Sequence, residues 1–343
     1  MTRIQSRAFG CSAVTLALLI ASAMTTPVRA ADGAAVPTIT AAPTVATSAL
    51  HFQTVEGEGG VPLNVVTAGD KSKPPILFVH GIGQSYVSWE NQLRAPLTDE
   101  FFVVAFDLRG HGNSGKPWNK DAYRDYRNYA GDVQAVIKAT QIDRPVLVGW
   151  SYGTLVVADY LRAFGISGLR GIVLTGAYGG FTPPPQRTPA PNATPQGQKV
   201  VQQLAQTMAE KMKLMSQQLL GSNLEDNIAG ARAFSRILTA KEMPAAYYER
   251  ATQISLMLPG YARRWMFDRP LANMDLIPQI NVPILLNVGG KDPSTPEKDA
   301  RDLAAKIKGA QVSVYAACGH SPFAEEPQRY NRELAEFARA ALR

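Results

Sequence analysis

Cysteine is scarce in this sequence, which has only Cys11 and Cys318 among its 343 residues. Removal of an N-terminal leader containing Cys11 would leave one cysteine, and this excludes a framework of disulfide bonds within the chain. Runs of lysine and arginine are also missing, although the formal net charge is +7. Since the basic residues are dispersed, the composition does not favour a nucleic-acid partner.

The apolar run near the N-terminus, over residues 8–24, is short for a membrane span. It follows Arg3 and Arg7 and precedes a Val-Arg-Ala tripeptide at 28–30. A basic start, a short apolar run and small residues before a cleavage point are typical of a secretory signal peptide. We therefore predict a signal peptide over 1–30, a periplasmic or secreted protein, and no stable membrane span after cleavage. An uncleaved anchor is the alternative.

Residues 31–48 are rich in Ala, Pro and Thr and have no apolar period, so we expect a disordered tether. Residues 49–343 then read as one domain. Two short strands near its start predict an antiparallel edge, and apolar strands alternate with helical patterns from Ile76 onward. This alternation predicts an α/β fold with a mostly parallel central sheet and helices on both faces.

The most informative segment is residues 146–154, where an apolar strand leads into Gly-Trp-Ser-Tyr-Gly and then into a helical pattern. This is the Gly-x-Ser-x-Gly form of a nucleophile elbow. A serine at the tip of such a turn is held in a strained backbone conformation, and strand and helix approach too closely for side chains at 149 and 153. Ser151 is therefore the candidate nucleophile.

Two candidates for the partners of this serine, Asp292 and His320, each follow a buried strand late in the chain. A serine hydroxyl needs a base within hydrogen-bond reach, and the base needs a third group that fixes its tautomer. His51 lies near the start of the domain, and His80 and His111 lie in glycine-rich turns, so His320 is the best-placed base. The alternatives are that Asp292 caps the next helix and that His320 is a surface-loop residue.

An oxyanion hole would need two backbone N–H donors beside the nucleophile. The first is the N–H of Tyr152, directly after Ser151. The second is the N–H of Ile82, in a His-Gly-x-Gly turn that ends an earlier apolar strand. The alternative interpretation of that turn is a plain strand-to-helix connection.

The order Ser151, Asp292, His320, with each residue just beyond a strand, resembles the α/β-hydrolase fold family. The stretches 107–114 and 149–153 resemble its serine esterase and cofactor-free haloperoxidase-like branch. The resemblance implies a Ser-Asp-His triad that works without metal or organic cofactor. Family members with an aspartate nucleophile resemble haloalkane dehalogenases and epoxide hydrolases, and a serine at 151 argues against both.

The alternation of strands and helices breaks after the sixth core strand. A proline-rich stretch and helical patterns occupy residues 180–270, so we predict an inserted helical cap there. We expect adaptable apolar side chains of this cap to line a substrate pocket. These candidates are Met208, Met212, Met215, Met257, Trp265 and Met266. Simple packing of the cap on the core is the alternative.

Together these features predict an exported serine hydrolase that cleaves carboxylic esters of small to medium apolar substrates through an acyl-enzyme. Its partner would be a small ester-like molecule, with no cofactor or metal. The same triad would also serve a lactonase, an amide or peptide hydrolase, or a perhydrolase. A binding protein or receptor on a hydrolase scaffold is a further alternative, and the sequence does not indicate an oligomeric state.

The predicted leader gives a direct test of export. Expressed in a bacterial host, the protein should be recovered from the periplasm or medium with its N-terminus near Ala31. Intact mass and N-terminal sequencing measure this. A full-length chain that begins at Met1 and stays in the cytoplasm would contradict the prediction.

Overall fold

The computed structural model describes residues 49–94, 96–182, 195–269 and 272–343. Side chains at 195–205, 208 and 209 are not described. The predicted signal peptide and tether, residues 1–48, lie outside the described residues.

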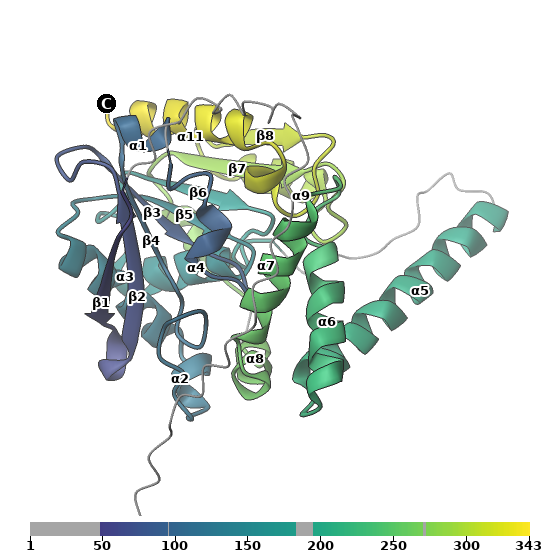
Figure 1. Cartoon of the computed structure of the whole chain (residues 1–343). Helices are drawn as coiled ribbons and strands as arrows, with labels where there is room; N and C mark the ends of the chain where they lie inside the picture. Colours follow the sequence, from purple (N-terminus) through teal and green to yellow (C-terminus); the bar gives the residue numbers. More distant parts are fainter. Residues whose placement is uncertain (1–48, 95, 183–194, 270–271) are drawn as a thin grey trace, which may run out of the picture. The chain divides into compact units, whose positions relative to one another are not determined.

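The described strands form one eight-stranded sheet in the order β1-β2-β4-β3-β5-β6-β7-β8 (Figure 1). The β2 strand pairs antiparallel with β1 and β4, and every other pairing is parallel. The strands are β1 His51–Glu56, β2 Pro62–Ala68, β3 Pro75–Val79, β4 Phe102–Phe106, β5 Val146–Trp150, β6 Gly171–Thr175, β7 Ile284–Gly289 and β8 Gln311–Tyr315. The predicted mostly parallel sheet with an antiparallel edge is confirmed.

Helices cover both faces of this sheet. The short helical segments are η1 Glu58–Gly60, η2 Tyr86–Trp89, α1 Leu97–Glu100, α2 Asp121–Arg124, η3 Met274–Gln279 and α10 Pro322–Glu325. The longer core helices are α3 Tyr126–Thr140, α4 Tyr152–Phe164, α9 Glu297–Ala304 and α11 Pro327–Ala341.

Alternate residues of each central strand enter different apolar cores, as the period of two in a strand requires. Leu77 belongs to the core that contains residues of α3 and α4, whereas its neighbour Phe78 belongs to the core that contains residues of α11. Both faces of β3 are therefore buried, which is why its sequence is continuously apolar.

A helical cap lies between β6 and β7 in the chain, as predicted. Its helices are α5 Pro195–Leu220, α6 Leu224–Arg236, α7 Ala245–Leu256 and α8 Gly260–Phe267. The α6 helix packs against both α5 and α7, and α8 contacts α2 and α5. Among the described helices, none is both long enough and apolar enough to cross a membrane.

The turn from β5 into α4 is as tight as the glycine spacing predicts. Ser151 has φ 53° and ψ −118°, in the left-handed half of backbone space that side chains disfavour. A Cβ on Gly149 would lie 2.7 Å from the carbonyl oxygen of Gly153, and one on Gly153 would lie 2.2 Å from that of Val79. Only glycine therefore lets α4 start this close to β5 and β3.

This packing predicts the effect of Gly153→Ala. Because the added methyl group would meet the Val79 carbonyl oxygen, the free energy of unfolding should fall by about 3 kcal/mol. Gly260→Ala is the matched control, since its nearest neighbour would be 3.4 Å away and alanine favours the helical conformation. Urea unfolding of both variants measures the difference. An unchanged midpoint for Gly153→Ala would show that the close approach is not a constraint.

Candidate active site

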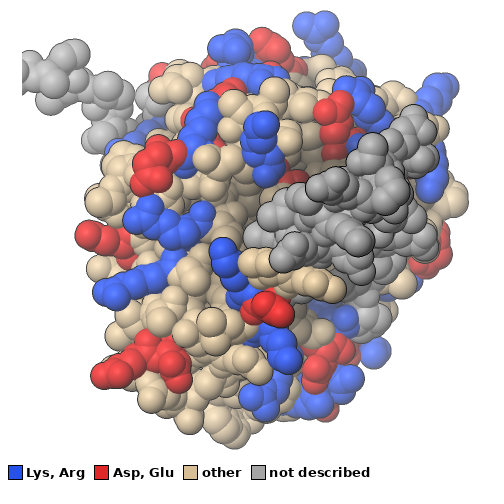
Figure 2. Space-filling view, turned by 90° about the vertical axis from the view of Figure 1, so that its right-hand side faces the viewer, with Lys and Arg blue, Asp and Glu red and all other residues tan. Residues whose placement is uncertain are grey.

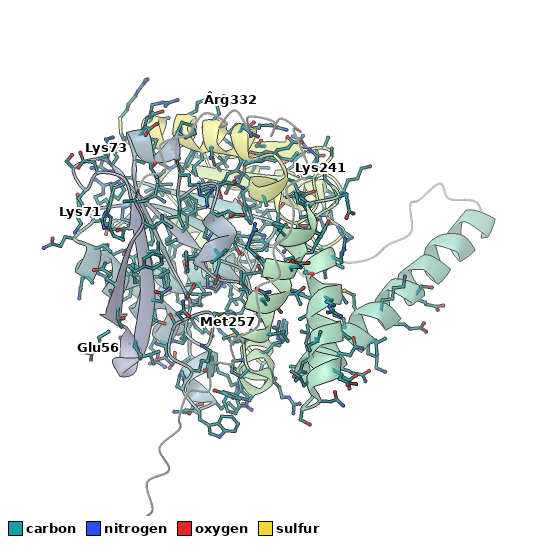
Figure 3. The ribbon with its side chains drawn as sticks, viewed as in Figure 1. Glu56, Lys71, Lys73, Lys241, Met257 and Arg332 are labelled. Carbon is teal, nitrogen blue, oxygen red and sulfur yellow. The ribbon has the colours of Figure 1, made fainter. Side chains whose placement is uncertain are left out.

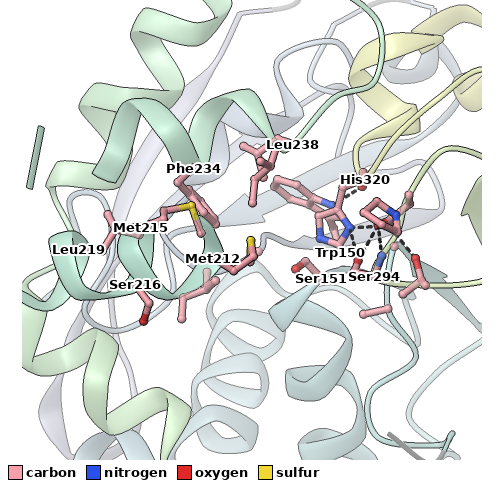
Figure 4. Close-up of a pocket in the computed structure, with 18 of the residues that line it drawn as sticks. Trp150, Ser151, Met212, Met215, Ser216, Leu219, Phe234, Leu238, Ser294 and His320 are labelled. Atoms are coloured by element: carbon pink, nitrogen blue, oxygen red, sulfur yellow. Dashed lines mark hydrogen bonds and ion pairs between the residues drawn. The ribbon is translucent and has the colours of Figure 1, made fainter. Parts of the chain in front are cut away.

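Three side chains meet at the carboxyl ends of the parallel strands. Ser151 directly follows β5, Asp292 lies three residues after β7, and His320 lies five residues after β8. All three line one cavity of about 520 Å³, in which Figure 4 labels Ser151 and His320 together. The fold thus brings the three sequence candidates to one place from distant parts of the chain.

The Asp292 carboxylate is bonded to the imidazole of His320. The distance between Asp292 Oδ2 and His320 Nδ1 is 2.6 Å. The hydroxyl of Thr295 donates to the same oxygen, and the N–H and hydroxyl of Ser294 donate to Oδ1. The next helix, α9, receives no cap from a side chain. Asp292 therefore orients the histidine instead of capping that helix.

These bonds also determine the charge of Asp292. Burial alone would raise its pKa, but the hydrogen bonds and charge of His320, with the hydroxyls of Ser294 and Thr295, outweigh burial. The pKa of Asp292 is consequently lower than its usual value, and the group is an anion at neutral pH.

Neighbouring strand ends hold His320 in place. Its carbonyl oxygen accepts a hydrogen bond of 2.8 Å from the indole Nε1–H of Trp150. A Cβ on Gly176, after β6, would lie 3.1 Å from His320 Nδ1, so this glycine allows the ring to approach. Since Nδ1 faces Asp292, the other ring nitrogen, Nε2, is the one left to exchange a proton in the cavity.

The two predicted oxyanion donors border the nucleophile. Tyr152 is the first residue of α4, so its N–H has no acceptor within the helix. The loop that carries Ile82 packs on the serine, because a Cβ on Gly81 would lie 3.0 Å from Ser151 Cβ. Ile82 itself lines the cavity.

His80 supports this loop, a role that sequence reasoning did not assign. Its Nδ1 lies 2.7 Å from the Gly81 carbonyl oxygen, and its Nε2 accepts the N–H of Leu108 at 3.0 Å. Burial lowers the pKa of His80, and the nearby Asp107 only partly offsets this. The neutral ring therefore ties the loop that carries Ile82 to the loop after β4. The position of His80 directly before Gly81 was the available sequence signal.

The cap supplies most of the apolar lining. Met212 and Met215, both predicted pocket residues, line the cavity from α5. Other apolar residues of the cap line it too, namely Leu219, Phe234, Ile237, Leu238 and Phe267. The side chain of Met208 lies outside the described residues.

Met257, Trp265 and Met266 do not line this cavity, so that part of the predicted pocket is wrong. Met257 follows the end of α7 and is 40% exposed (Figure 3). On α8 the residues that face the cavity are Arg263 and Phe267, four positions apart and hence on one face. Trp265 and Met266 lie on other faces of that helix and pack in an apolar cluster with Tyr123.

The cysteine near His320, Cys318, fits a structural role. Cys318 is buried, and burial raises the pKa of its thiol to about 12, so it is not a thiolate nucleophile at neutral pH. Among the described residues, no group of three or more His, Cys, Asp or Glu side chains is placed to hold a metal ion. Figure 2 shows one face of the molecule, where basic side chains are interspersed with acidic ones.

Comparison with known proteins agrees with this architecture. The sequence profile of the alpha/beta hydrolase fold family matches residues 74–327, and the chain belongs to that family. A solved putative aryl esterase from Burkholderia cenocepacia is 30% identical, with a TM-score of 0.72, covering 85% of this chain and 99% of that chain. The esterase RhEst1 from a Rhodococcus species is 26% identical, with a TM-score of 0.69, covering 84% and 99%.

A putative non-heme chloroperoxidase from a Synechocystis species is a further relative, 25% identical over 276 residues that cover 79% of this chain and 94% of the relative. The predicted resemblance to the esterase and haloperoxidase-like branch is confirmed. The family and its esterase-like neighbours support a hydrolase activity for this chain.

The Asp292 bonds predict a pH-dependent stability. A carboxyl whose folded pKa is lowered stabilises the fold above its unfolded pKa of about 3.9, and this is lost as pH falls through the folded pKa. Asp292→Asn should therefore unfold more easily than wild type by about 1–3 kcal/mol at neutral pH, and the gap should shrink below about pH 4. Urea unfolding at several pH values measures it, with the exposed Asp302→Asn as control. An equal gap at all pH values would contradict the assignment.

Proposed function

We propose that this protein is an exported serine hydrolase that cleaves carboxylic esters of small to medium, largely apolar substrates. One observation carries the proposal. Ser151, at a strained strand-to-helix turn, lines the same cavity as His320. The Nδ1 of His320 is hydrogen-bonded to Asp292 Oδ2 at 2.6 Å. A serine, a histidine and a carboxylate so arranged form the set needed for nucleophilic acyl transfer.

In the first half of the reaction, Ser151 Oγ attacks the ester carbonyl carbon while His320 Nε2 accepts its proton. Asp292 stabilises the imidazolium that forms. The N–H groups of Ile82 and Tyr152 donate to the oxyanion. The intermediate collapses when the C–O bond to the alcohol breaks, and His320 returns the proton to that leaving oxygen.

In the second half, a water molecule attacks the acyl-enzyme. His320 Nε2 takes a proton from this water, and the oxyanion again lies against Ile82 and Tyr152. Collapse releases the carboxylic acid and returns the proton to Ser151 Oγ. The chain thus supplies every group that the proposed reaction needs, and no step depends on a cofactor.

The substrate class follows from the cavity and from the relatives. Methionine, leucine and phenylalanine side chains of the cap form much of the wall, and each buried methylene group of a substrate would contribute about 0.8 kcal/mol at most. The cavity volume of about 520 Å³ suits a small to medium molecule. The two solved structures named as esterases support an ester as the reacting group.

The export part of the proposal depends on the sequence of residues 1–30, where a basic start, an apolar run and small residues succeed one another.

A perhydrolase is the second candidate, favoured by the relative named as a putative non-heme chloroperoxidase. Hydrogen peroxide would then replace water in attack on the acyl-enzyme, and the product would be a peracid. Supplying both nucleophiles to the purified enzyme and measuring peracid against free acid distinguishes the two reactions.

The nucleophile assignment predicts the effect of Ser151→Ala. Hydrolysis of a p-nitrophenyl ester should drop by several orders of magnitude, since the members of a triad act as a unit. Labelling by a fluorophosphonate probe should disappear, while the melting temperature should stay close to that of wild type, because alanine keeps the Cβ and the same backbone conformation.

Ser216→Ala is the matched control, because Ser216 lines the same cavity from α5. It should keep both turnover and probe labelling. If Ser151→Ala retained more than about a tenth of the wild-type rate, Ser151 would not be the nucleophile.

A further inference from the structure

A buried arginine without an acidic partner lies in the wall of the same cavity. Arg263, on α8, is only 2% exposed and lines the cavity with Ser151. Its Nη2 donates to the carbonyl oxygen and to the hydroxyl of Ser255, each at 3.1 Å. Its Nε is buried with no hydrogen-bond partner, and its Nη1 donates to none of the described residues.

Two other buried arginines of this protein each form an ion pair with an aspartate. Arg109 is paired with Asp132 at 2.7 Å, and Arg269 is paired with Asp159 at 2.6 Å. Arg263 forms no ion pair within the described part of the chain. The undescribed side chains between 183 and 209 include no aspartate or glutamate. A cation removed from water without a partner is costly unless something else supplies the opposite charge.

The remaining neighbours of Arg263 do not supply that charge. The guanidinium lies 5.7 Å from the ring centre of Phe234. His111 is a nearby titratable group, and burial lowers its pKa so far that it stays neutral. Burial also lowers the pKa of Arg263, to about 10, so the arginine itself is charged at neutral pH.

The position of the guanidinium relative to the nucleophile can be bounded. A Cβ on Gly83 would lie 2.9 Å from Arg263 Nη1, and one on Gly81 would lie 3.0 Å from Ser151 Cβ. Because the Cα atoms of Gly81 and Gly83 are at most about 7 Å apart, Arg263 Nη1 lies at most about 16 Å from Ser151 Cβ. This bound leaves room for a substrate with its ester at Ser151 and a second polar group at Arg263.

We propose that Arg263 binds a carboxylate on the substrate, so that the enzyme acts on esters that carry an anionic group a few carbon atoms from the scissile bond. This rests on the proposed function and narrows its substrate class. Nη1 has no partner among the described residues and can donate to a carboxylate, while the bonds of Nη2 to Ser255 hold the guanidinium in place. The carboxylate belongs either to the acyl part or to the alcohol part of the ester.

Two pairs of esters separate charge from shape. The acyl-side pair is mono-p-nitrophenyl glutarate and its amide counterpart, p-nitrophenyl glutaramate. The alcohol-side pair is the acetate ester of 4-hydroxybutanoate and that of 4-hydroxybutanamide. In at least one pair, wild type should show a kcat/KM about 10- to 100-fold higher for the carboxylate, as expected for a charged hydrogen bond. The favoured pair identifies the part that carries the charge.

Arg263→Gln should remove this preference by slowing the carboxylate substrate while changing the amide less than about threefold. Arg263→Lys should retain part of it, since lysine keeps the charge and an N–H donor but loses the planar guanidinium. Arg264→Gln, next in sequence and exposed, is the matched control and should behave like wild type. Equal losses on both members of a pair would overturn the proposal and leave Arg263 a packing role.

A binding measurement covers the case in which Arg263→Gln does not fold or the proposed chemistry is wrong. Glutarate should raise the melting temperature of folded Ser151→Ala in a concentration-dependent way, and glutaramide should not. This readout needs no turnover, so it tests Arg263 independently of the hydrolase assignment. If glutarate does not bind and wild type prefers neither carboxylate, the proposal fails, whereas absent probe labelling at Ser151 would refute the proposed function instead.

Discussion

The close approach of α4 to the ends of β3 and β5 is the constraint on which the rest of the site depends. It places Ser151 at φ 53° and leaves no space for a side chain at Gly149 or Gly153. The packing of α4 in the apolar core beneath the sheet holds Ser151 in this strained conformation. The same turn places the Tyr152 N–H at the start of a helix, where it is free to donate.

The other groups are then positioned relative to that turn by neighbouring elements. The Trp150 indole N–H donates a hydrogen bond to the carbonyl oxygen of His320. Because Gly176 has no side chain, the ring of His320 can approach this turn. The cap is held to the core near the same point. The Glu325 carboxylate accepts one hydrogen bond from the N–H of Ala240, in the cap, and another from the N–H of Gly319, just before His320. Core and cap thus meet around one cavity, with Ser151, Asp292 and His320 on the core and much of the apolar wall on the cap.

Much of the core was predictable from sequence because its signals are local. The glycine spacing around Ser151 reports a steric requirement of one turn, and a buried strand reads as an apolar run. The lining of the cavity was not predictable, because it depends on how each cap helix is rotated about its axis. Met212 faces the cavity but Met266 does not. Arg263 faces the cavity, whereas its neighbour Arg264 is exposed. A charged pair in an otherwise apolar helix was the available signal.

Trapping the acyl-enzyme tests the central claim most directly. Wild-type protein mixed with p-nitrophenyl acetate would be quenched in acid within the first turnover, digested, and its peptides identified by mass spectrometry. We expect the peptide containing Ser151 to gain one acetyl group, with a burst of nitrophenol equal to the enzyme concentration. Acetylation at another residue, or turnover with neither burst nor acyl-peptide, would contradict it.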